Sequence, residues 1–136
     1  MKKADNWKKS YKNYKKALAT LKDDVEIAET RKLTSPEKQD TIENFDHTIA
    51  LAWDVMKDYL ADQGIIGINE NGEAVRYAFK NNLIEDKNVW MDMLKEHKNA
   101  SKSNDDKTAD DLLDSIVTTY YSLFNVLAER IDELEE

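Results

Sequence analysis

Few side chains in this sequence have a type and spacing that could do chemistry, and the two histidines are the first to consider. His47 and His97 lie on different predicted helices, and neither has a second histidine three or four residues away. A zinc site would need such a pair or cysteines, and the chain has no cysteine. We therefore expect no metal site and no cofactor. We expect His47 on a solvent face and His97 at the rim of the core, on the face that carries Trp90 and Met93.

Four aspartates gather where the last helix is predicted to begin, at positions 105, 106, 110 and 111. Carboxylates with this spacing could bind a divalent cation. Acidic residues in a first turn also complement the positive end of the helix dipole, and this simpler role is the one we expect.

Five lysines project from one side of the first predicted helix: Lys8, Lys9, Lys12, Lys15 and Lys16. A surface that follows nucleic-acid phosphates has this character. A binder of single strands, however, would interleave aromatic residues among its lysines for base stacking. Here Trp7, Tyr11 and Tyr14 follow the opposite seam. We therefore expect a solvated basic face close to the acidic C-terminal helix.

Long amphipathic helices must position these side chains. Apolar residues recur at spacings of three and four over residues 4–31, 35–64 and from 105 or 106 to about 134. In the second of these helices, Ser35 is the predicted N-cap, Pro36 the first helical residue and Gly64 the C-terminal stop. The short connection at residues 32–34 makes the first two helices antiparallel neighbours.

Two shorter helices are expected between the long ones. The first covers about residues 73–82, with Phe79 facing inward. The second begins at Asp86 or Asn88 and frays near residues 101–104. The sequence therefore predicts an all-α protein in which the three long helices, whose lengths match, share one core.

The composition fits a single helical domain over residues 1–136 with a net charge of −8. The first 22 residues hold eight lysines and one aspartate, whereas residues 105–136 hold ten acidic and two basic residues. The net acidity disfavours nucleic acid as a general partner, although the basic start keeps a local site open. We see no apolar run of membrane-spanning length and no signal peptide, and the lack of cysteine fits a reducing compartment, so we expect a cytoplasmic protein without a membrane partner.

The order of several blocks resembles the nucleotidyltransferase substrate-binding protein family of the HEPN superfamily from about residue 7 to 130. The blocks are Tyr14-Lys15-Lys16-Ala17-Leu18, Leu51-Ala52-Trp53, Lys57-Asp58-Tyr59-Leu60, Val75-Arg76-Tyr77-Ala78-Phe79 and Trp90-Met91-Asp92-Met93-Leu94. The resemblance implies an antiparallel up-and-down four-helix bundle, here with one extra short helix, that is typically a homodimer. It also implies a separately encoded minimal nucleotidyltransferase as partner. In related pairs the bundle protein is an RNase toxin and the nucleotidyltransferase is its antitoxin.

The family's polar motif follows the helix that contains Trp90. It reads Arg-Asn, two residues, Ser-His, one residue, Tyr, and its Arg and His make the RNase centre, while its Tyr can be adenylylated by the partner. Aligned without gaps, these motif positions fall in order on His97, Lys98, Ser101, Lys102 and Asn104. Only the serine is kept. A shift by one residue matches Lys98 and Asn99 to Arg-Asn but supplies no second histidine.

These replacements matter chemically. Lys102 would stay protonated near pH 7 and is a poor general base, and Asn104 has no hydroxyl to modify. We therefore expect a non-catalytic accessory subunit with neither RNase activity nor adenylylation. Its vestigial motif positions could still contact a phosphate. Two alternatives stay open: an RNase toxin with a rearranged site around His97, Ser101 and Lys102, and a nucleic-acid-binding module that uses the lysine face.

Overall fold

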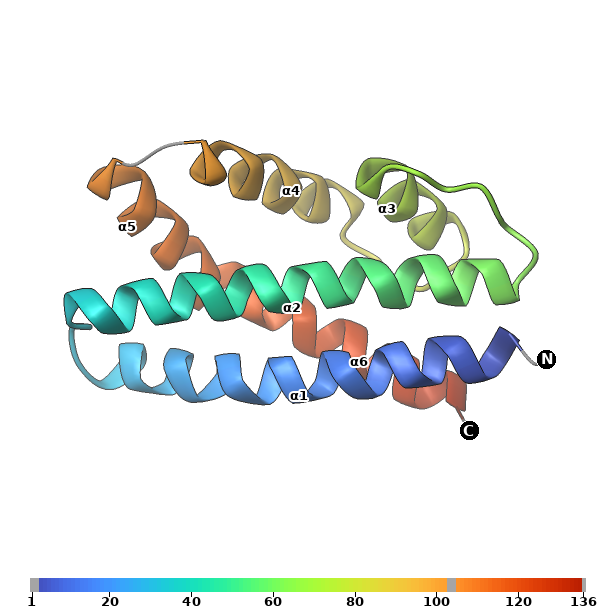
Figure 1. The fold of residues 1–136 in the computed structure, drawn as a ribbon, viewed down its shortest axis with the longest axis horizontal. Helices are drawn as coiled ribbons and strands as arrows, with labels where there is room; N and C mark the ends of the chain where they lie inside the picture. Colours follow the sequence, from blue (N-terminus) through green and yellow to red (C-terminus); the bar gives the residue numbers. More distant parts are fainter. Residues whose placement is uncertain (1–2, 103–104, 136) are drawn as a thin grey trace.

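The computed structural model describes residues 3–102 and 105–135, and over these residues it is all-helical, as the sequence predicted (Figure 1). The helices are α1 (Lys3–Thr30), α2 (Ser35–Asp62), α3 (Asn71–Lys80), α4 (Lys87–Ser101), α5 (Asp106–Ser115), the π-helix η1 (Ile116–Tyr120) and α6 (Tyr121–Glu135). The last three follow one another without a break.

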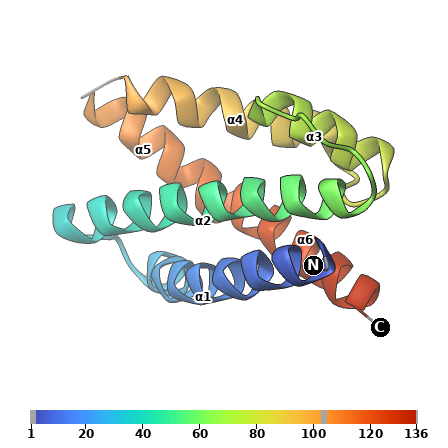
Figure 2. The same ribbon diagram turned by 45° about the vertical axis from the view of Figure 1, so that its right-hand side comes forward.

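The helices are arranged around α2, which lies at the centre of the molecule. α1 and α2 form a long antiparallel pair, and α3 and α4 lie along the other side of α2 (Figures 1 and 2). The α5–η1–α6 rod runs obliquely across this layer, with α5 against α2 and α4 and with α6 against α1. The up-and-down four-helix topology, the finer expectation, stays a prediction.

The start of α2 differs from the prediction by one residue, because its N-cap is Thr34 and not Ser35. The Thr34 hydroxyl accepts a hydrogen bond from the Glu37 N–H at 3.3 Å, and the Glu37 carboxylate accepts one from the Thr34 N–H at 2.9 Å. This reciprocal pair is a capping box. The other end is as predicted: Gly64 adopts a positive φ of 90°, which lets Ile65 donate its N–H to the Leu60 carbonyl and close the helix.

Arg31 holds the capping carboxylate with two hydrogen bonds, of 2.8 and 2.6 Å, to the two oxygens of Glu37. These bonds, followed by the one from the Thr34 backbone, lower the pKa of Glu37 from 4.5 to about 2. An acid whose pKa is lowered on folding adds stability above its ordinary pKa. It loses that stability as the pH falls toward the folded value.

Replacing Glu37 with glutamine should therefore flatten the acid limb of the stability curve. Glutamine keeps an oxygen that can accept the Thr34 N–H, so the cap survives while the titrating charge is removed. We expect the urea midpoint of the wild type to fall more steeply than that of Glu37→Gln between pH 4.5 and about 2. Parallel curves over this interval would contradict the assignment.

The core is one cluster of buried apolar side chains to which every helix contributes. Phe124 of α6 lies at its centre. The centroid of its ring is 6.3 Å from that of Tyr14, 5.9 Å from that of Phe45 and 5.9 Å from that of Trp90. Tyr14 also donates its hydroxyl hydrogen to the Phe124 carbonyl at 2.7 Å. This one ring therefore joins α1, α2 and α4 to α6.

Two further predictions need correction. The last helix begins where it was predicted, at Asp106 after the N-cap Asp105, but it is not an α-helix throughout, because it widens into a π-helix at residues 116–120. Phe79 does not face inward, and 41% of its surface is exposed. The buried stripe of α3 is centred on Ala74 and Ala78, which leaves Phe79 at its edge, where the Lys87 ammonium lies 5.2 Å from the ring centroid.

Candidate functional site

The candidate site lies at the C-terminal end of α4. His97, Lys98 and Ser101 belong to the last turns of this helix, and Lys102 is its C-cap. The other motif position, Asn104, lies outside the described residues. His97 is partly buried, whereas Lys98, Ser101 and Lys102 are exposed.

His97 is fixed against α2. Its Nε2 lies 2.9 Å from an Asp46 carboxylate oxygen, and its ring centroid is 5.8 Å from those of both Phe45 and Trp53, in edge-to-face geometry. The side chain keeps an exposed fraction of 21%. His97 therefore lies at the rim of the core, as its position on the Trp90 face predicted.

A second polar link lies one residue earlier. Tyr120 donates its hydroxyl hydrogen to one oxygen of Glu96 at 2.5 Å, and Ser115 donates to the other oxygen at 3.3 Å. Burial, and then the bond to Glu96, raises the pKa of Tyr120 far above its ordinary value. The phenol therefore stays a neutral hydrogen-bond donor. We call Asp46, Glu96, His97 and Tyr120 the α4 anchor.

The π-helix positions the tyrosine of this anchor. Tyr120 is the last residue of η1, and its ring stacks on Phe45 with a centroid distance of 5.9 Å and an interplanar angle of 19°. A π-turn carries an extra residue relative to an α-turn, and such segments often occur at functional sites. Here the wider turn accompanies a hydroxyl that reaches across to α4.

The sequence did not reveal Glu96 or Tyr120 as partners. Tyr120 falls on the apolar face of the last helix and looks like an ordinary core residue. Glu96 is not itself a position of the family's motif. The only local signal is a glutamate next to the histidine that the resemblance singles out. Its partner lies 24 residues away, across a helix crossing that spacing alone cannot predict.

Removing the Tyr120 hydroxyl should measure the strength of this link. Tyr120→Phe keeps the ring on Phe45 but leaves the Glu96 carboxylate with a weaker set of donors. We expect the free energy of unfolding to fall by about 1–3 kcal/mol. In a double-mutant cycle, Glu96→Gln and Tyr120→Phe should couple; strictly additive effects would show that the bond does not stabilise the fold.

The chemistry available at the α4 anchor is limited. His97 is engaged by Asp46, and Glu96 is engaged by two hydroxyl donors. The chain has three arginines, Arg31, Arg76 and Arg130, and none of them lies on α4, α5 or η1. The anchor thus pairs acids with hydrogen-bond donors between helices, and it lacks a guanidinium that could fork around a phosphate.

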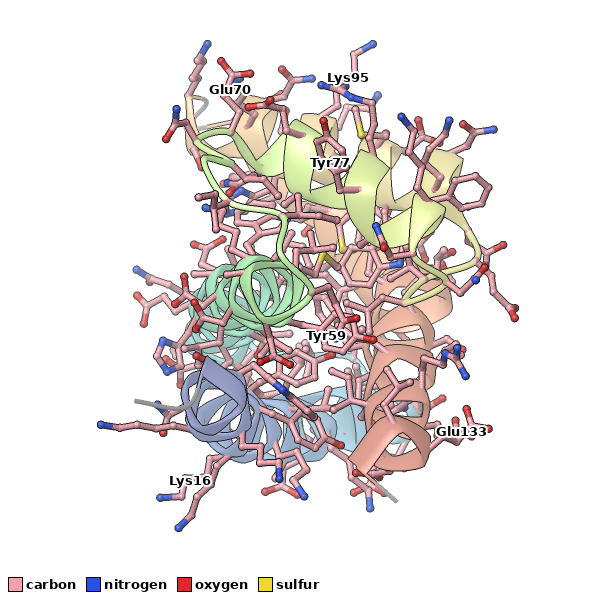
Figure 3. The ribbon with its side chains drawn as sticks, turned by 90° about the vertical axis from the view of Figure 1, so that its right-hand side faces the viewer. Lys16, Tyr59, Glu70, Tyr77, Lys95 and Glu133 are labelled. Atoms are coloured by element: carbon pink, nitrogen blue, oxygen red, sulfur yellow. The ribbon has the colours of Figure 1, made fainter. Side chains whose placement is uncertain are left out.

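The basic face of α1 is exposed at all five predicted positions, Lys8, Lys9, Lys12, Lys15 and Lys16. Figure 3 shows Lys16 extending away from α1. Lys16 and the exposed His47 line an open hollow between α1 and α2. On the other side of α1, Tyr11 donates its hydroxyl hydrogen to Asp132 of α6 at 2.5 Å, so the basic helix does lie beside the acidic one.

The aspartate cluster at the start of α5 has structural partners. Asp105 caps the helix by accepting the Lys107 N–H at 3.2 Å, and Asp110 lies 3.1 Å from the ammonium of Lys38 on α2. Over residues 3–102 and 105–135, no three histidine or acidic side chains gather closely enough to hold a metal ion. In that same part of the chain, no helix has the length and apolar character needed to cross a membrane.

Comparison with known proteins shows which family the chain belongs to. None of the curated proteins compared with the chain matches it. A family model described as "Nucleotidyltransferase substrate binding protein like" matches residues 9–133, which is nearly the whole chain and includes the α4 anchor and all lysines of the basic face of α1 except Lys8. This chain therefore belongs to the family of nucleotidyltransferase substrate binding protein-like proteins.

Proposed function

We propose that this protein is a non-catalytic accessory subunit that pairs with a separately encoded minimal nucleotidyltransferase and helps to present its substrate. The observation that carries the proposal is the family match over residues 9–133. Because the match covers almost all of the chain, substrate binding is proposed for the helical protein itself, and nucleotidyl transfer for its partner.

The side chains at the end of α4 support a role without catalysis. An acid–base RNase needs a histidine that is free to exchange protons and a cation that binds the phosphate. The exposed Lys102 occupies the motif's second histidine position, and no arginine lies on α4, α5 or η1. Lys98 and Lys102 could still contact a phosphate of the partner's substrate. We also propose that the protein forms a homodimer and that it descends from a component of a toxin–antitoxin pair.

A tagged copy expressed in its native host tests the partner. We expect a small nucleotidyltransferase to co-purify in stoichiometric amount and to be identified by mass spectrometry. Recovery of the tagged protein without any nucleotidyltransferase, under conditions that keep it folded, would overturn the proposal.

A labelled-RNA assay tests the non-catalytic part of the proposal. We expect no cleavage by the wild type. Cleavage by the wild type that disappears in both His97→Ala and Lys102→Ala would contradict the proposal and establish the rearranged RNase site.

The exposed lysine face favours nucleic-acid binding as a second candidate function. All five lysines of the face are exposed on α1, and Lys16 shares its hollow with His47. Binding through this face would weaken steeply as salt increases. Equal affinity for RNA in the wild type and in a Lys12→Glu, Lys16→Glu variant would exclude this face as the binding surface.

A further inference from the structure

A pocket of about 170 Å³ lies between the α3–α4 connection and α6. Half of its lining residues are apolar, and these come from both sides: Leu83, Ile84, Trp90, Leu123, Val126 and Leu127. Five of these side chains are buried, but Val126 keeps 46% of its surface exposed at the mouth. The pocket therefore offers an apolar interior that can be reached from the surface.

The size of the pocket limits what it can hold. An apolar cavity of about 150 Å³ accepts a guest the size of benzene. A volume of about 170 Å³ therefore suits one aromatic ring and is too small for a whole nucleotide. One anchoring side chain in a pocket is a common way for a small surface to contribute most of the affinity for a partner.

The rim of the pocket is acidic. Glu85 and Asp86 line it from the α3–α4 connection, and Glu129 and Glu133 line it from α6. Figure 3 shows Glu133 extending outward from α6 on this face. Arg130 is the one basic residue among the lining side chains described, and it lies 3.7 Å from a Glu133 oxygen. The rim therefore attracts positive charge and disfavours a phosphate or another anion.

A hydrogen bond from a side chain to the backbone ties the two sides of the pocket together. Arg130 donates its Nε hydrogen to the Asn82 carbonyl at 2.8 Å, which joins α6 to the end of α3. Asn82 itself adopts a positive φ of 62°, a conformation that asparagine tolerates better than most residues. The chain thus turns back at this point and carries Leu83 and Ile84 into the wall, so the pocket is formed before any partner arrives.

We propose that this pocket receives a single aromatic side chain, flanked by lysine or arginine, from a segment of the nucleotidyltransferase partner. The chemistry of the segment follows from the apolar interior and the acidic rim. The identity of the partner rests on the proposed function. The pocket is thus an interaction surface separate from the α4 anchor and from the basic face of α1.

Capped pentapeptides test the chemistry without the partner. The probe is Lys-Lys-Phe-Lys-Lys, and the matched controls are Lys-Lys-Ala-Lys-Lys and Glu-Glu-Phe-Glu-Glu. In NMR spectra of the labelled protein, we expect the probe to shift the Trp90 indole N–H signal and the Val126 and Leu127 amide signals saturably. Equal shifts with either control peptide, shifts confined to other surfaces, or no shift at millimolar peptide would overturn the proposal.

Two variants locate the binding site. Val126→Arg places a long cation in the mouth of the pocket. It should lower the affinity for the probe peptide at least about tenfold, the scale of a lost anchor contact. Ile66→Arg makes the same change at a residue with 75% of its surface exposed and outside the pocket, so it should leave the affinity unchanged. Equal weakening in both variants would show that only net charge matters and would contradict the pocket.

The same variants separate this inference from the proposed function. With purified nucleotidyltransferase, we expect Val126→Arg to lose the complex and Ile66→Arg to keep it. If both variants form the complex as well as the wild type, the proposed role of the pocket is wrong and the proposed function stands. If the wild type forms no complex, the partner is wrong, and the peptide titration alone decides whether the pocket binds an aromatic cationic segment.

Discussion

Replacing Phe124 with alanine is expected to lower the free energy of unfolding by about 3–5 kcal/mol. The ring is fully buried and packs against Tyr14, Phe45 and Trp90, which come from three other helices. Neighbours held by three separate helices cannot easily collapse into the space that the ring leaves. The loss of transfer free energy is therefore joined by the cost of a cavity.

Urea unfolding followed by circular dichroism measures this loss. Val126→Ala is the matched control, because it shortens an exposed apolar side chain two residues away on the same helix and should change stability by less than about 0.5 kcal/mol. A Phe124→Ala variant with a midpoint close to that of the control would show that the four helices do not depend on this ring.

The second large effect should be found at alkaline pH and should depend on Tyr14. Burial, and secondarily the neighbouring Tyr11, raises the pKa of Tyr14 well above its ordinary value of 10.0. A group whose pKa is raised on folding gives its full stabilisation below the unfolded pKa, and this is lost as the pH rises toward the folded value. The titration of Tyr14 alone should therefore lower the free energy of unfolding by about 1.4 kcal/mol for each pH unit above 10.

Tyr14→Phe isolates this contribution from the titration of the lysines, which both proteins share. Near pH 8 the variant should be less stable by about 1 kcal/mol, because it loses the hydrogen bond to the Phe124 carbonyl. Above pH 10 the difference should shrink, and the two stability curves should cross at about pH 11. Curves that stay parallel up to pH 12 would contradict the burial of a neutral phenol at this position.

The helices could be predicted because their apolar residues repeat at helical spacing, which depends only on local sequence. The one-residue error at the start of α2 arose from a choice between Thr34 and Ser35, both good caps. The spacing from Thr34 to Glu37 already contained the capping-box signal that favours threonine. The π-helix at residues 116–120 left no such signal, because its apolar residues also fit an ordinary helical face.

The site was only partly predictable, because some of its contacts depend on the local helix face and others on how distant helices cross. The position of His97 at the core rim follows from the face of its own helix. The link between Glu96 and Tyr120 and the pocket beside Val126 depend on how α6 crosses the rest of the molecule. Such crossings are set by side chains far apart in the sequence, and periodicity alone does not specify them.

The most direct test of the accessory-subunit account is size-exclusion chromatography with light scattering, using the purified protein and the nucleotidyltransferase of the same organism. The account predicts that the two co-elute with a mass that includes both chains, and that nucleotidyl transfer is stronger in the complex than with the enzyme alone. Separate elution at concentrations well above micromolar, with transfer unchanged by the helical protein, would contradict it.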